Sequence, residues 1–187
     1  MKNIQFIKES LKNLREVGTI FPSSEFVVEK MVSPINFEKK LTILELGSGN
    51  GVITKKLLEK MNCDSQLVCF EINKKFYQEL NKINNERMIL INKSAEKMKS
   101  YLNEFDIEKV DYIVSSLPLV SLPKETTNKI LSVSVEILGK SGKLIQLQYT
   151  KLLDKKLKSY YNQIDIQFTL KNYFPAFIYT CYNQKPL

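Results

Sequence analysis

The segment 41–58, LTILELGSGNGVITKKLL, constrains the fold of this chain more than any other part of it. An apolar run carries Glu45 near its end and leads into three glycines at alternate positions, Gly47, Gly49 and Gly51, before a helical pattern begins. Glycine allows a sharp turn and a close approach of the backbone to a ligand, and the following helix points its N-terminus at the same place. The segment therefore predicts a strand, a ligand-binding loop and a helix of an open α/β sheet.

Short apolar runs alternate with helical patterns from residue 41 onward. The expected strands are Thr42–Leu46, Gln66–Glu71, Met88–Asn92, Val110–Ser115, Lys143–Tyr149, Asp165–Leu170 and Phe177–Tyr182. Amphipathic helices are expected at 52–62, 74–84, 95–104 and 125–138. This alternation predicts an α/β fold, with a seven-stranded, mostly parallel sheet and helices on both faces. The last two strands are separated only by KNYFPA, which is too short for a helical crossover, so the last strand should be antiparallel.

The length of 187 residues fits one domain, 1–187, with N-terminal helices in 1–35 and a catalytic core in 41–187. Apolar residues at helical spacing predict a basic amphipathic helix over residues 2–15, which either packs on the core or meets a membrane or a partner. A second helix is expected at Ser24–Val32, with Ser23 or Ser24 as its N-cap.

The charge of +8 favours partners that carry phosphate, such as RNA or an anionic bilayer, although it could serve solubility alone. Arginine occurs only at positions 15 and 87, and lysine is poorly suited to reading base edges, so no specific nucleic acid is expected. The chain has no histidine and three cysteines without CxxC spacing, so we expect reduced thiols and no metal site. No signal peptide and no membrane span are indicated, which predicts a cytoplasmic protein.

Two familiar nucleotide loops do not match the glycine segment. A dinucleotide fingerprint needs glycine at position 52, and a P-loop needs glycine there followed by Lys and Ser or Thr, whereas the chain has Val52, Ile53 and Thr54. The remaining pattern, E-x-G-x-G-x-G, resembles the motif I loop of class I S-adenosylmethionine-dependent methyltransferases. The resemblance implies a Rossmann-like methyltransferase fold, S-adenosylmethionine as cofactor, S-adenosylhomocysteine as product, and no metal.

Further residues fit this cofactor. Glu71 closes the second strand, 20 residues beyond Gly51, where a carboxylate can accept hydrogen bonds from ribose hydroxyls. The third strand leads into INKSAEKM, and in the methyltransferase superfamily the residues there flank the adenine. The expected cofactor-binding residues of the core are Glu45, Gly47, Ser48, Gly49, Gly51, Glu71, Ile72, Ser94, Ala95 and Ser115.

Five segments in order give a finer resemblance. They are LREVGTIFPSS (14–24), LELGSGNGVIT (44–54), SSLPLVSLP (115–123), IQLQYT (145–150) and NYFPAFIY (172–179). Together they resemble the bacterial phospholipid N-methyltransferases, which are related in fold to ribosomal RNA adenine dimethylases. The resemblance implies stepwise methylation of the amine of phosphatidylethanolamine towards phosphatidylcholine. It also implies a phospholipid substrate at an anionic membrane surface, an enzyme held peripherally at the inner face of the membrane, and a monomer.

The remaining site residues come from a loop pattern, from the chemistry of an amine acceptor and, for Arg15, Thr19 and Ser23, from the same resemblance. Ser116-Leu117-Pro118-Leu119 is similar to the (N/D/S)-P-P-(Y/F) loop of amino-nitrogen methyltransferases, but Leu119 cannot stack on a flipped base. Oxygen acceptors should suffice to receive and orient the amine, so no strong base is required. The expected catalytic residues are Ser115, Ser116, Leu117 through its carbonyl, and Tyr149, although Tyr149 could equally be a packing residue. Thr19 and Ser23 are expected at the cofactor, and Arg15, Pro118 and Leu119 at the substrate.

Other functions stay open at this point. The chain could methylate RNA adenine at N6 or another amino nitrogen, which the charge and the related fold favour. It could also methylate a small molecule or a protein. A binding module without catalysis is a further alternative, which failure to bind S-adenosylmethionine would support.

Overall fold

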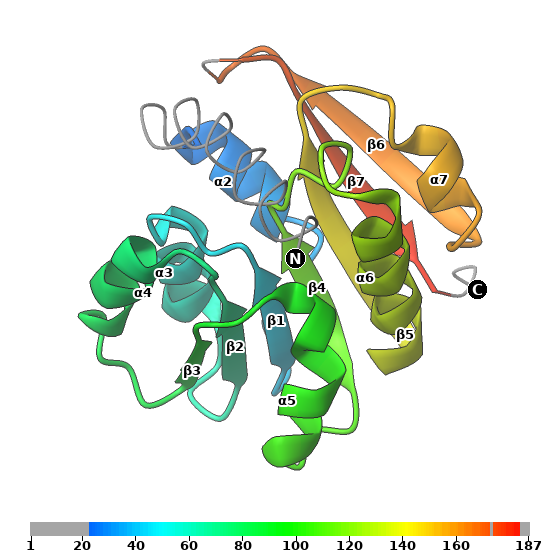
Figure 1. Cartoon of the computed structure of the whole chain (residues 1–187). Helices are drawn as coiled ribbons and strands as arrows, with labels where there is room; N and C mark the ends of the chain where they lie inside the picture. The colour runs from blue at the N-terminus through cyan, green and yellow to red at the C-terminus, as the bar shows by residue number, and fades with distance from the viewer. Residues whose placement is uncertain (1–22, 173, 184–187) are drawn as a thin grey trace.

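The computed structural model of the chain describes residues 23–172 and 174–183 and contains one seven-stranded sheet (Figure 1). Its strands are β1 Thr42–Leu46, β2 Gln66–Phe70, β3 Met88–Ile91, β4 Val110–Ser115, β5 Leu138–Gln148, β6 Gln163–Thr169 and β7 Ala176–Tyr182. They lie in the order β3-β2-β1-β4-β5-β7-β6. Strands β1 to β5 pair in parallel, and β7 runs antiparallel to both β5 and β6. The mixed sheet and its antiparallel last strand are as the sequence predicted.

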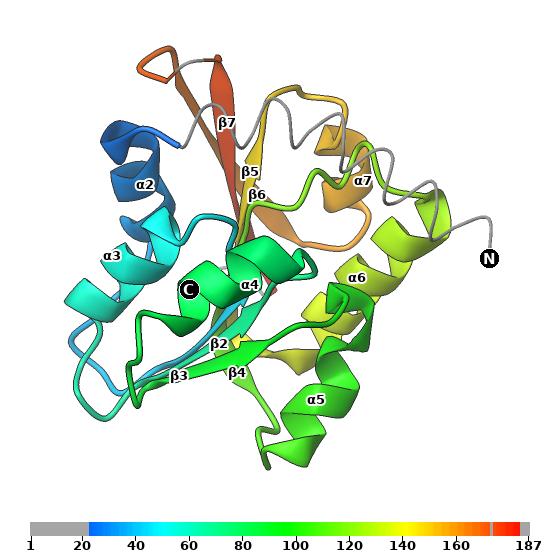
Figure 2. The same cartoon turned by 60° about the vertical axis from the view of Figure 1, so that its left-hand side comes forward.

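Helices cover both faces of this sheet. They are α2 Glu25–Val32, α3 Val52–Lys60, α4 Lys74–Asn81, α5 Met98–Glu104, α6 Lys124–Ile137 and α7 Asp154–Lys158, with a 3-10 turn at Ala95–Lys97 before α5. Figure 2 shows α2, α3 and α4 on one side of the sheet and α5, α6 and α7 on the other. The result is a three-layer sandwich, as the alternation of strands and helices requires.

The core follows the alternation of side chains along each strand. On β1, Ile43 belongs to the apolar cluster under α2 and α3, whereas Leu44 and Leu46 belong to the cluster under α5 and α6. Successive side chains of a strand point to opposite faces, so a strand covered on both faces must be apolar at nearly every position. Among the four buried residues of β1, Glu45 alone is polar.

Most elements match the sequence prediction to within three residues, and two differ more: the start of β5 and the helix α7. Strand β5 begins at Leu138 rather than at Lys143, because Leu138 pairs with Val110 of β4 across an irregularity in the register. Glycine and lysine around this start carry little strand propensity, which is why the pattern did not reveal it. Helix α7 was not predicted, because its five residues are mostly lysine. Its position comes from two buried leucines, Leu153 and Leu157.

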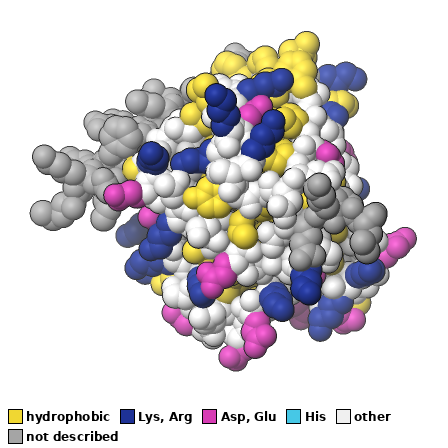
Figure 3. All heavy atoms as spheres, turned by 90° about the vertical axis from the view of Figure 1, so that its right-hand side faces the viewer, with side chains coloured by type: hydrophobic (Ala, Val, Ile, Leu, Met, Phe, Trp, Pro, Cys, Tyr) yellow, Lys and Arg dark blue, Asp and Glu magenta, His cyan; other side chains and the backbone are white. Residues whose placement is uncertain are grey.

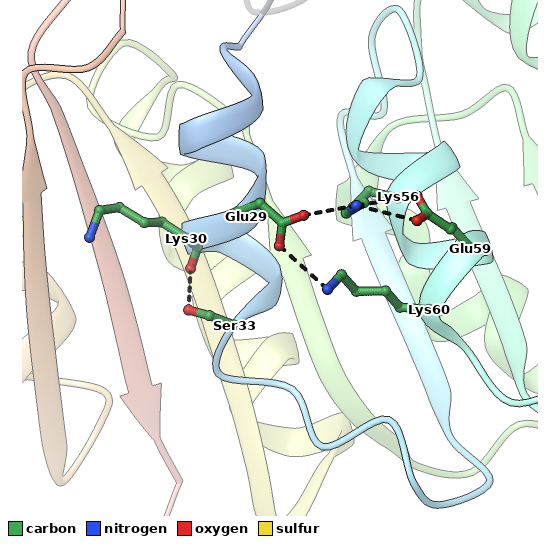
Figure 4. A network of polar contacts seen from close by, with 6 residues as sticks. All are labelled: Glu29, Lys30, Ser33, Lys56, Glu59 and Lys60. Carbon is green, nitrogen blue, oxygen red and sulfur yellow. Dashed lines mark hydrogen bonds and ion pairs between the residues drawn. The ribbon is translucent and has the colours of Figure 1, made fainter.

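Helix α2 joins the glycine-loop half of the sheet to the β6–β7 hairpin. Ser24 is its N-cap, as expected, and the Ser24 hydroxyl also donates a hydrogen bond to the carbonyl of Lys171 in the hairpin. At the other side, the Glu29 carboxylate contacts Lys56 of α3 at 2.8 Å and Lys60 at 3.4 Å (Figure 4). These contacts hold the first described residue, Ser23, over the edge of the sheet where the strands β1 to β5 end.

Candidate cofactor and acceptor site

A cavity of about 360 Å³ opens at the carboxyl ends of β1, β2, β4 and β5. The loops that follow β1, β2, β3, β4 and β5 line it, together with Ser23. This edge is where ligands of open α/β sheets bind, and the volume lies in the range of small-molecule sites. The glycine loop and the SSLPLVSLP segment, which are far apart in the sequence, therefore meet in one cavity.

The three glycines of the loop have positive φ angles but different surroundings. A Cβ atom on Gly47 would lie 2.9 Å from Leu117 Cδ2, and one on Gly51 would lie 2.8 Å from Leu80 Cδ2. Gly49 has φ +53°, and the nearest atom to a Cβ there is the carbonyl oxygen of Gly47, at 4.0 Å. Gly49 is thus the position where the bare backbone faces the cavity, whereas Gly47 and Gly51 permit close packing of the protein against itself.

Glu71 lies beside this loop and is oriented by backbone amides. Its Oε2 accepts a hydrogen bond from the Gly49 amide at 2.8 Å, and its Oε1 accepts one from the Asn73 amide at 2.6 Å. Glu71 and Ile72 both line the cavity. The end of β2 and the glycine loop are therefore held together by one carboxylate.

Glu45 lies beneath the loop and does not line the cavity. Its Oε2 accepts hydrogen bonds from the Thr54 hydroxyl at 2.7 Å and from the Cys69 thiol at 3.3 Å. Burial raises the pKa of Glu45, and the hydrogen bonds from its neighbours offset part of this shift. Through these two hydrogen bonds Glu45, on β1, connects the strand to α3 and β2. Its expected contact with the cofactor stays a prediction.

The third loop supplies Ser94 and Ala95, which both line the cavity. The Ser94 hydroxyl accepts a hydrogen bond from the Glu96 amide at 3.3 Å and caps the 3-10 turn. Lys93, which the sequence analysis did not select, lines the cavity next to them.

The loop after β4 is held by hydrogen bonds to the glycine loop, to two glutamines of β5 and within its own backbone. The Ser116 hydroxyl donates to the carbonyl of Gly47 at 2.7 Å. The Leu117 carbonyl accepts three hydrogen bonds, from the Leu119 amide at 2.8 Å, Gln146 Nε2 at 3.0 Å and Gln148 Nε2 at 2.9 Å. A carbonyl oxygen has two lone pairs, so in this arrangement Leu117 has no acceptor capacity left for a substrate amine.

Three predicted residues of this region differ in placement. Pro118 lines the cavity, as do Ser116 and Leu117. Ser115 is buried behind the loop, where its hydroxyl accepts from the Leu117 amide at 3.4 Å. Leu119 is only 2% exposed and packs in the core under α6, so it does not reach the cavity.

Tyr149 follows β5 and lines the cavity near its opening, with 42% of its surface exposed. Its hydroxyl interacts with Ser23 and Asn172. Partial burial raises the pKa of Tyr149 above its ordinary value, and these hydrogen bonds reduce the shift. The hydroxyl is therefore protonated at neutral pH.

Several lining residues were missed by the sequence analysis. Gln148 belongs to the segment IQLQ, in which two amides alternate with apolar residues on a buried strand; that alternation was a usable signal. Phe76, Val120, Leu122, Thr126 and Ile130 gave no such signal, because they line the cavity through ordinary helical and loop positions. Arg15, Thr19 and the expected helix over residues 2–15 lie outside the described residues.

The described residues were considered for two further features, a metal site and a membrane-spanning helix. No group of three or more Cys, Asp or Glu side chains within 23–172 and 174–183 is arranged to hold a metal ion. No helix in the same part of the chain is both long and apolar enough to cross a membrane.

Comparison with protein families gives one match that covers most of the chain. Residues 11–165 match the model of the family described as ribosomal RNA adenine dimethylase.

Individual relatives divide into two kinds. An ornithine lipid N-methyltransferase of Singulisphaera acidiphila is 25% identical over 94% of this chain and 93% of its own length. A ribosomal RNA small subunit methyltransferase A of Mesomycoplasma hyopneumoniae is 28% identical over 75% of this chain but only 49% of its own length. The counterpart of Borreliella burgdorferi is 30% identical over 62% of this chain and 41% of its own length. The chain thus spans about half or less of these ribosomal RNA methyltransferases.

Solved structures share the fold. An rRNA methylase of Streptococcus thermophilus aligns with a TM-score of 0.62 at 15% identity, over 86% of this chain and 95% of that one. A Burkholderia thailandensis 1,6-didemethyltoxoflavin-N1-methyltransferase with bound S-adenosylhomocysteine aligns with a TM-score of 0.71 at 12% identity, over 98% of this chain and 87% of that one. The seven-stranded sheet is therefore a Rossmann-like methyltransferase fold.

Proposed function

The chain belongs to the ribosomal RNA adenine dimethylase family and is an S-adenosylmethionine-dependent methyltransferase, and we propose that it methylates the primary amine of phosphatidylethanolamine, towards phosphatidylcholine. The observation that carries this proposal is how much of each relative's length aligns with this chain. A lipid-amine N-methyltransferase matches this chain nearly end to end, whereas the ribosomal RNA methyltransferases that match it extend to about twice the matched length.

The cofactor would lie across the loops after β1, β2 and β3. The open side of Gly49 leaves room for its amino-acid part against the bare backbone, Glu71 would accept the ribose hydroxyls, and Ser94 with Ala95 would flank the adenine. A Cβ at Gly49 would occupy space that no described protein atom fills, which supports the fit. When bound, S-adenosylmethionine supplies an electrophilic methyl group.

The acceptor amine must be neutral to receive that methyl group, and an alkylammonium group titrates near pH ~10. Ser116 is suited to hold the amine, because its hydroxyl proton is engaged by the Gly47 carbonyl and its oxygen accepts. Tyr149, protonated and partly exposed in the same cavity, can orient the head group through its hydroxyl. The amine proton then passes to water at this exposed mouth, and no histidine is needed.

Two other acceptors have specific support. The name of the Singulisphaera acidiphila relative favours ornithine lipid as the acceptor, and its amine would be methylated at the same site. The family model and the charge of +8 favour adenine in RNA. Leu119, which occupies the aromatic position of the (N/D/S)-P-P-(Y/F) pattern, is buried in the core and offers no stacking surface for a flipped base.

An assay with radiolabelled S-adenosylmethionine tests the proposal. The full chain is incubated in parallel with phosphatidylethanolamine in anionic vesicles, ornithine lipid in the same vesicles, and bulk RNA. Label in a methylated ethanolamine lipid is the expected result. Label in ornithine lipid alone would move the proposal to that acceptor, and label in RNA alone would overturn it. The Gly49→Val variant serves as the control without cofactor binding.

A further inference from the structure

We propose that the end of the β6–β7 hairpin, together with helix α2 and the loop after β5, forms a surface that enters an anionic bilayer beside the cavity. This surface, the hairpin rim, consists of Phe26, Leu152, Phe168 and Leu170 with three lysines, Lys30, Lys151 and Lys171. The inference rests on the proposed function, because it assigns the place where a lipid-methylating enzyme meets its substrate.

The apolar part of the rim is exposed and concentrated. Leu152 is 76% exposed and Leu170 is 69% exposed, and Phe168 follows at 51%. Figure 3 shows hydrophobic side chains gathered at the top of the molecule, with lysine or arginine side chains close beside them. Single exposed apolar residues are common on protein surfaces, but several large exposed apolar side chains on neighbouring segments beside a binding cavity indicate an interaction site.

The lysines lie directly against this apolar surface. Lys171 Nζ is 4.8 Å from the centre of the Phe26 ring, and Lys30 Nζ is 5.3 Å from it. On the other face of the hairpin, Lys151 Nζ lies 5.4 Å from the Phe177 ring, which packs against Phe168 at 5.0 Å. Lysines beside exposed leucine and phenylalanine side chains match the interface of an anionic bilayer, where ammonium groups meet phosphates and apolar side chains reach the acyl region.

The topology places the rim at the edge of the sheet where the cavity opens. Strand β7 is antiparallel to both β5 and β6, so β5 and β6 end on the same side. Leu152 follows the end of β5 by four residues, and Tyr149 between them lines the cavity. A bilayer in contact with the rim would therefore bring lipid head groups to the mouth that Tyr149 occupies.

RNA would use such a surface differently. Phe26 and Phe168 can stack on bases, but the two most exposed apolar side chains of the rim are leucines, which have no aromatic face. Its cations are lysines and not arginines, so a bilayer fits the composition better.

The chain contains no tryptophan, which allows one to be placed as a local probe. We would compare Leu170→Trp with Phe105→Trp in the full chain; Phe105 is 44% exposed but follows α5 at the opposite edge of the sheet. With vesicles of phosphatidylethanolamine and phosphatidylglycerol, emission from Leu170→Trp should shift to shorter wavelength and be quenched by brominated acyl chains. Emission from Phe105→Trp should not change.

Sedimentation measures how much the rim contributes. The double variant Leu152→Ser/Leu170→Ser should lose roughly tenfold or more in vesicle affinity, because two large apolar side chains no longer enter the bilayer. Phe105→Ser should bind as the unaltered chain does. Lys151→Glu/Lys171→Glu should weaken binding at low salt, and Lys109→Glu, at the opposite edge, should not.

Two results would overturn the inference: an unshifted Leu170→Trp emission, or unaltered sedimentation of the double variant. A shift produced by RNA and not by vesicles would overturn it as well. Methyl transfer to phosphatidylethanolamine dispersed in detergent separates this inference from the proposed function. If the double variant methylates phosphatidylethanolamine in detergent but binds vesicles poorly, the rim inference and the proposed function are both supported. If no methyl transfer occurs in detergent but vesicle binding depends on the rim, only the proposed function is removed.

Discussion

The carboxylate of Glu71 accepts the backbone amide of Gly49 at 2.8 Å and so joins the end of β2 to the centre of the glycine loop. One side chain thereby sets the shape of a loop that precedes it by about twenty residues. Because the same carboxylate also accepts the Asn73 amide, both of its oxygens are oriented by the backbone.

Replacing Glu71 with Gln should weaken S-adenosylhomocysteine binding by about tenfold. The amide would set an N–H group against one of the two backbone N–H groups and would remove the charge from two charge-assisted hydrogen bonds. Isothermal titration calorimetry measures the affinity. Glu79→Gln, on the exposed side of α4 and outside the cavity lining, is the matched control and should bind nearly normally. Equal affinities for both variants would contradict this role of Glu71.

The Gly49→Val variant should show no measurable cofactor binding. Valine is strongly disfavoured at φ +53°, and its side chain would occupy the open side of the loop. Gly139→Val is the control, since a Cβ there meets no atom within 4 Å. Calorimetry reports binding and thermal unfolding reports folding. A folded Gly49→Val protein with unchanged affinity would refute the assignment of the loop.

Tyr149→Phe should lower turnover roughly three- to tenfold while leaving cofactor affinity nearly intact, because one hydrogen bond near the acceptor is lost. Burial raises the pKa of Tyr149, so the hydroxyl does not ionise near neutral pH. The rise of turnover between about pH 7 and 9 should therefore follow the substrate amine and persist in the variant. Normal turnover would make Tyr149 a packing residue, and loss of the rise would make it a base.

Gln148→Leu should lower both stability and turnover. It removes one of three donors to the Leu117 carbonyl, which we expect to cost about 1 kcal/mol in the free energy of unfolding. The loop that carries Ser116 would then be held less firmly. Urea unfolding and steady-state kinetics measure the two effects. Gln163→Leu, at the edge strand β6, should alter neither; similar losses in both variants would argue against a specific role.

Glu29→Gln should lower the melting temperature slightly at pH ~7 and not at pH ~3. The hydrogen bond from Lys56 lowers the pKa of Glu29 below its ordinary value. A carboxyl group with a lowered pKa stabilises the fold above the pKa of the unfolded chain, and the contribution is lost as pH falls through the folded pKa. High salt should also abolish the difference. Glu38→Gln, whose side chain forms no ion pair with a described residue, is the control. A difference that persists at low pH would contradict the ion-pair explanation.

Much of the fold could be predicted because local patterns carry it. The apolar runs of β1 and β2 are buried on both faces, and Ser24 caps α2 through a hydroxyl that the sequence already places there. The start of β5 at Leu138 could not be predicted, since pairing with Val110 and not local propensity extends the strand.

The cofactor half of the site could be predicted from the sequence, but the loop after β4 could not. Gly49 and Glu71 stand at positions whose backbone and charge requirements are visible in the sequence, and both line the cavity. Leu119 and Leu117 were different cases. Whether Leu119 faces the cavity or the core depends on the turn of its loop, and the acceptor capacity of the Leu117 carbonyl depends on two glutamines of another strand.

By itself, the sequence determined the α/β class and the position of the glycine loop, because periodicity and backbone requirements act over a few neighbouring residues. The type of cofactor followed from the resemblance of that loop to motif I of class I methyltransferases. Only the tertiary structure decided the insertion of β7 between β5 and β6, the hydrogen bonds that occupy the Leu117 carbonyl, and the position of Lys151 over the Phe177 ring of β7. These three features depend on contacts between segments that are far apart along the chain. Such contacts form only when the whole sheet has packed.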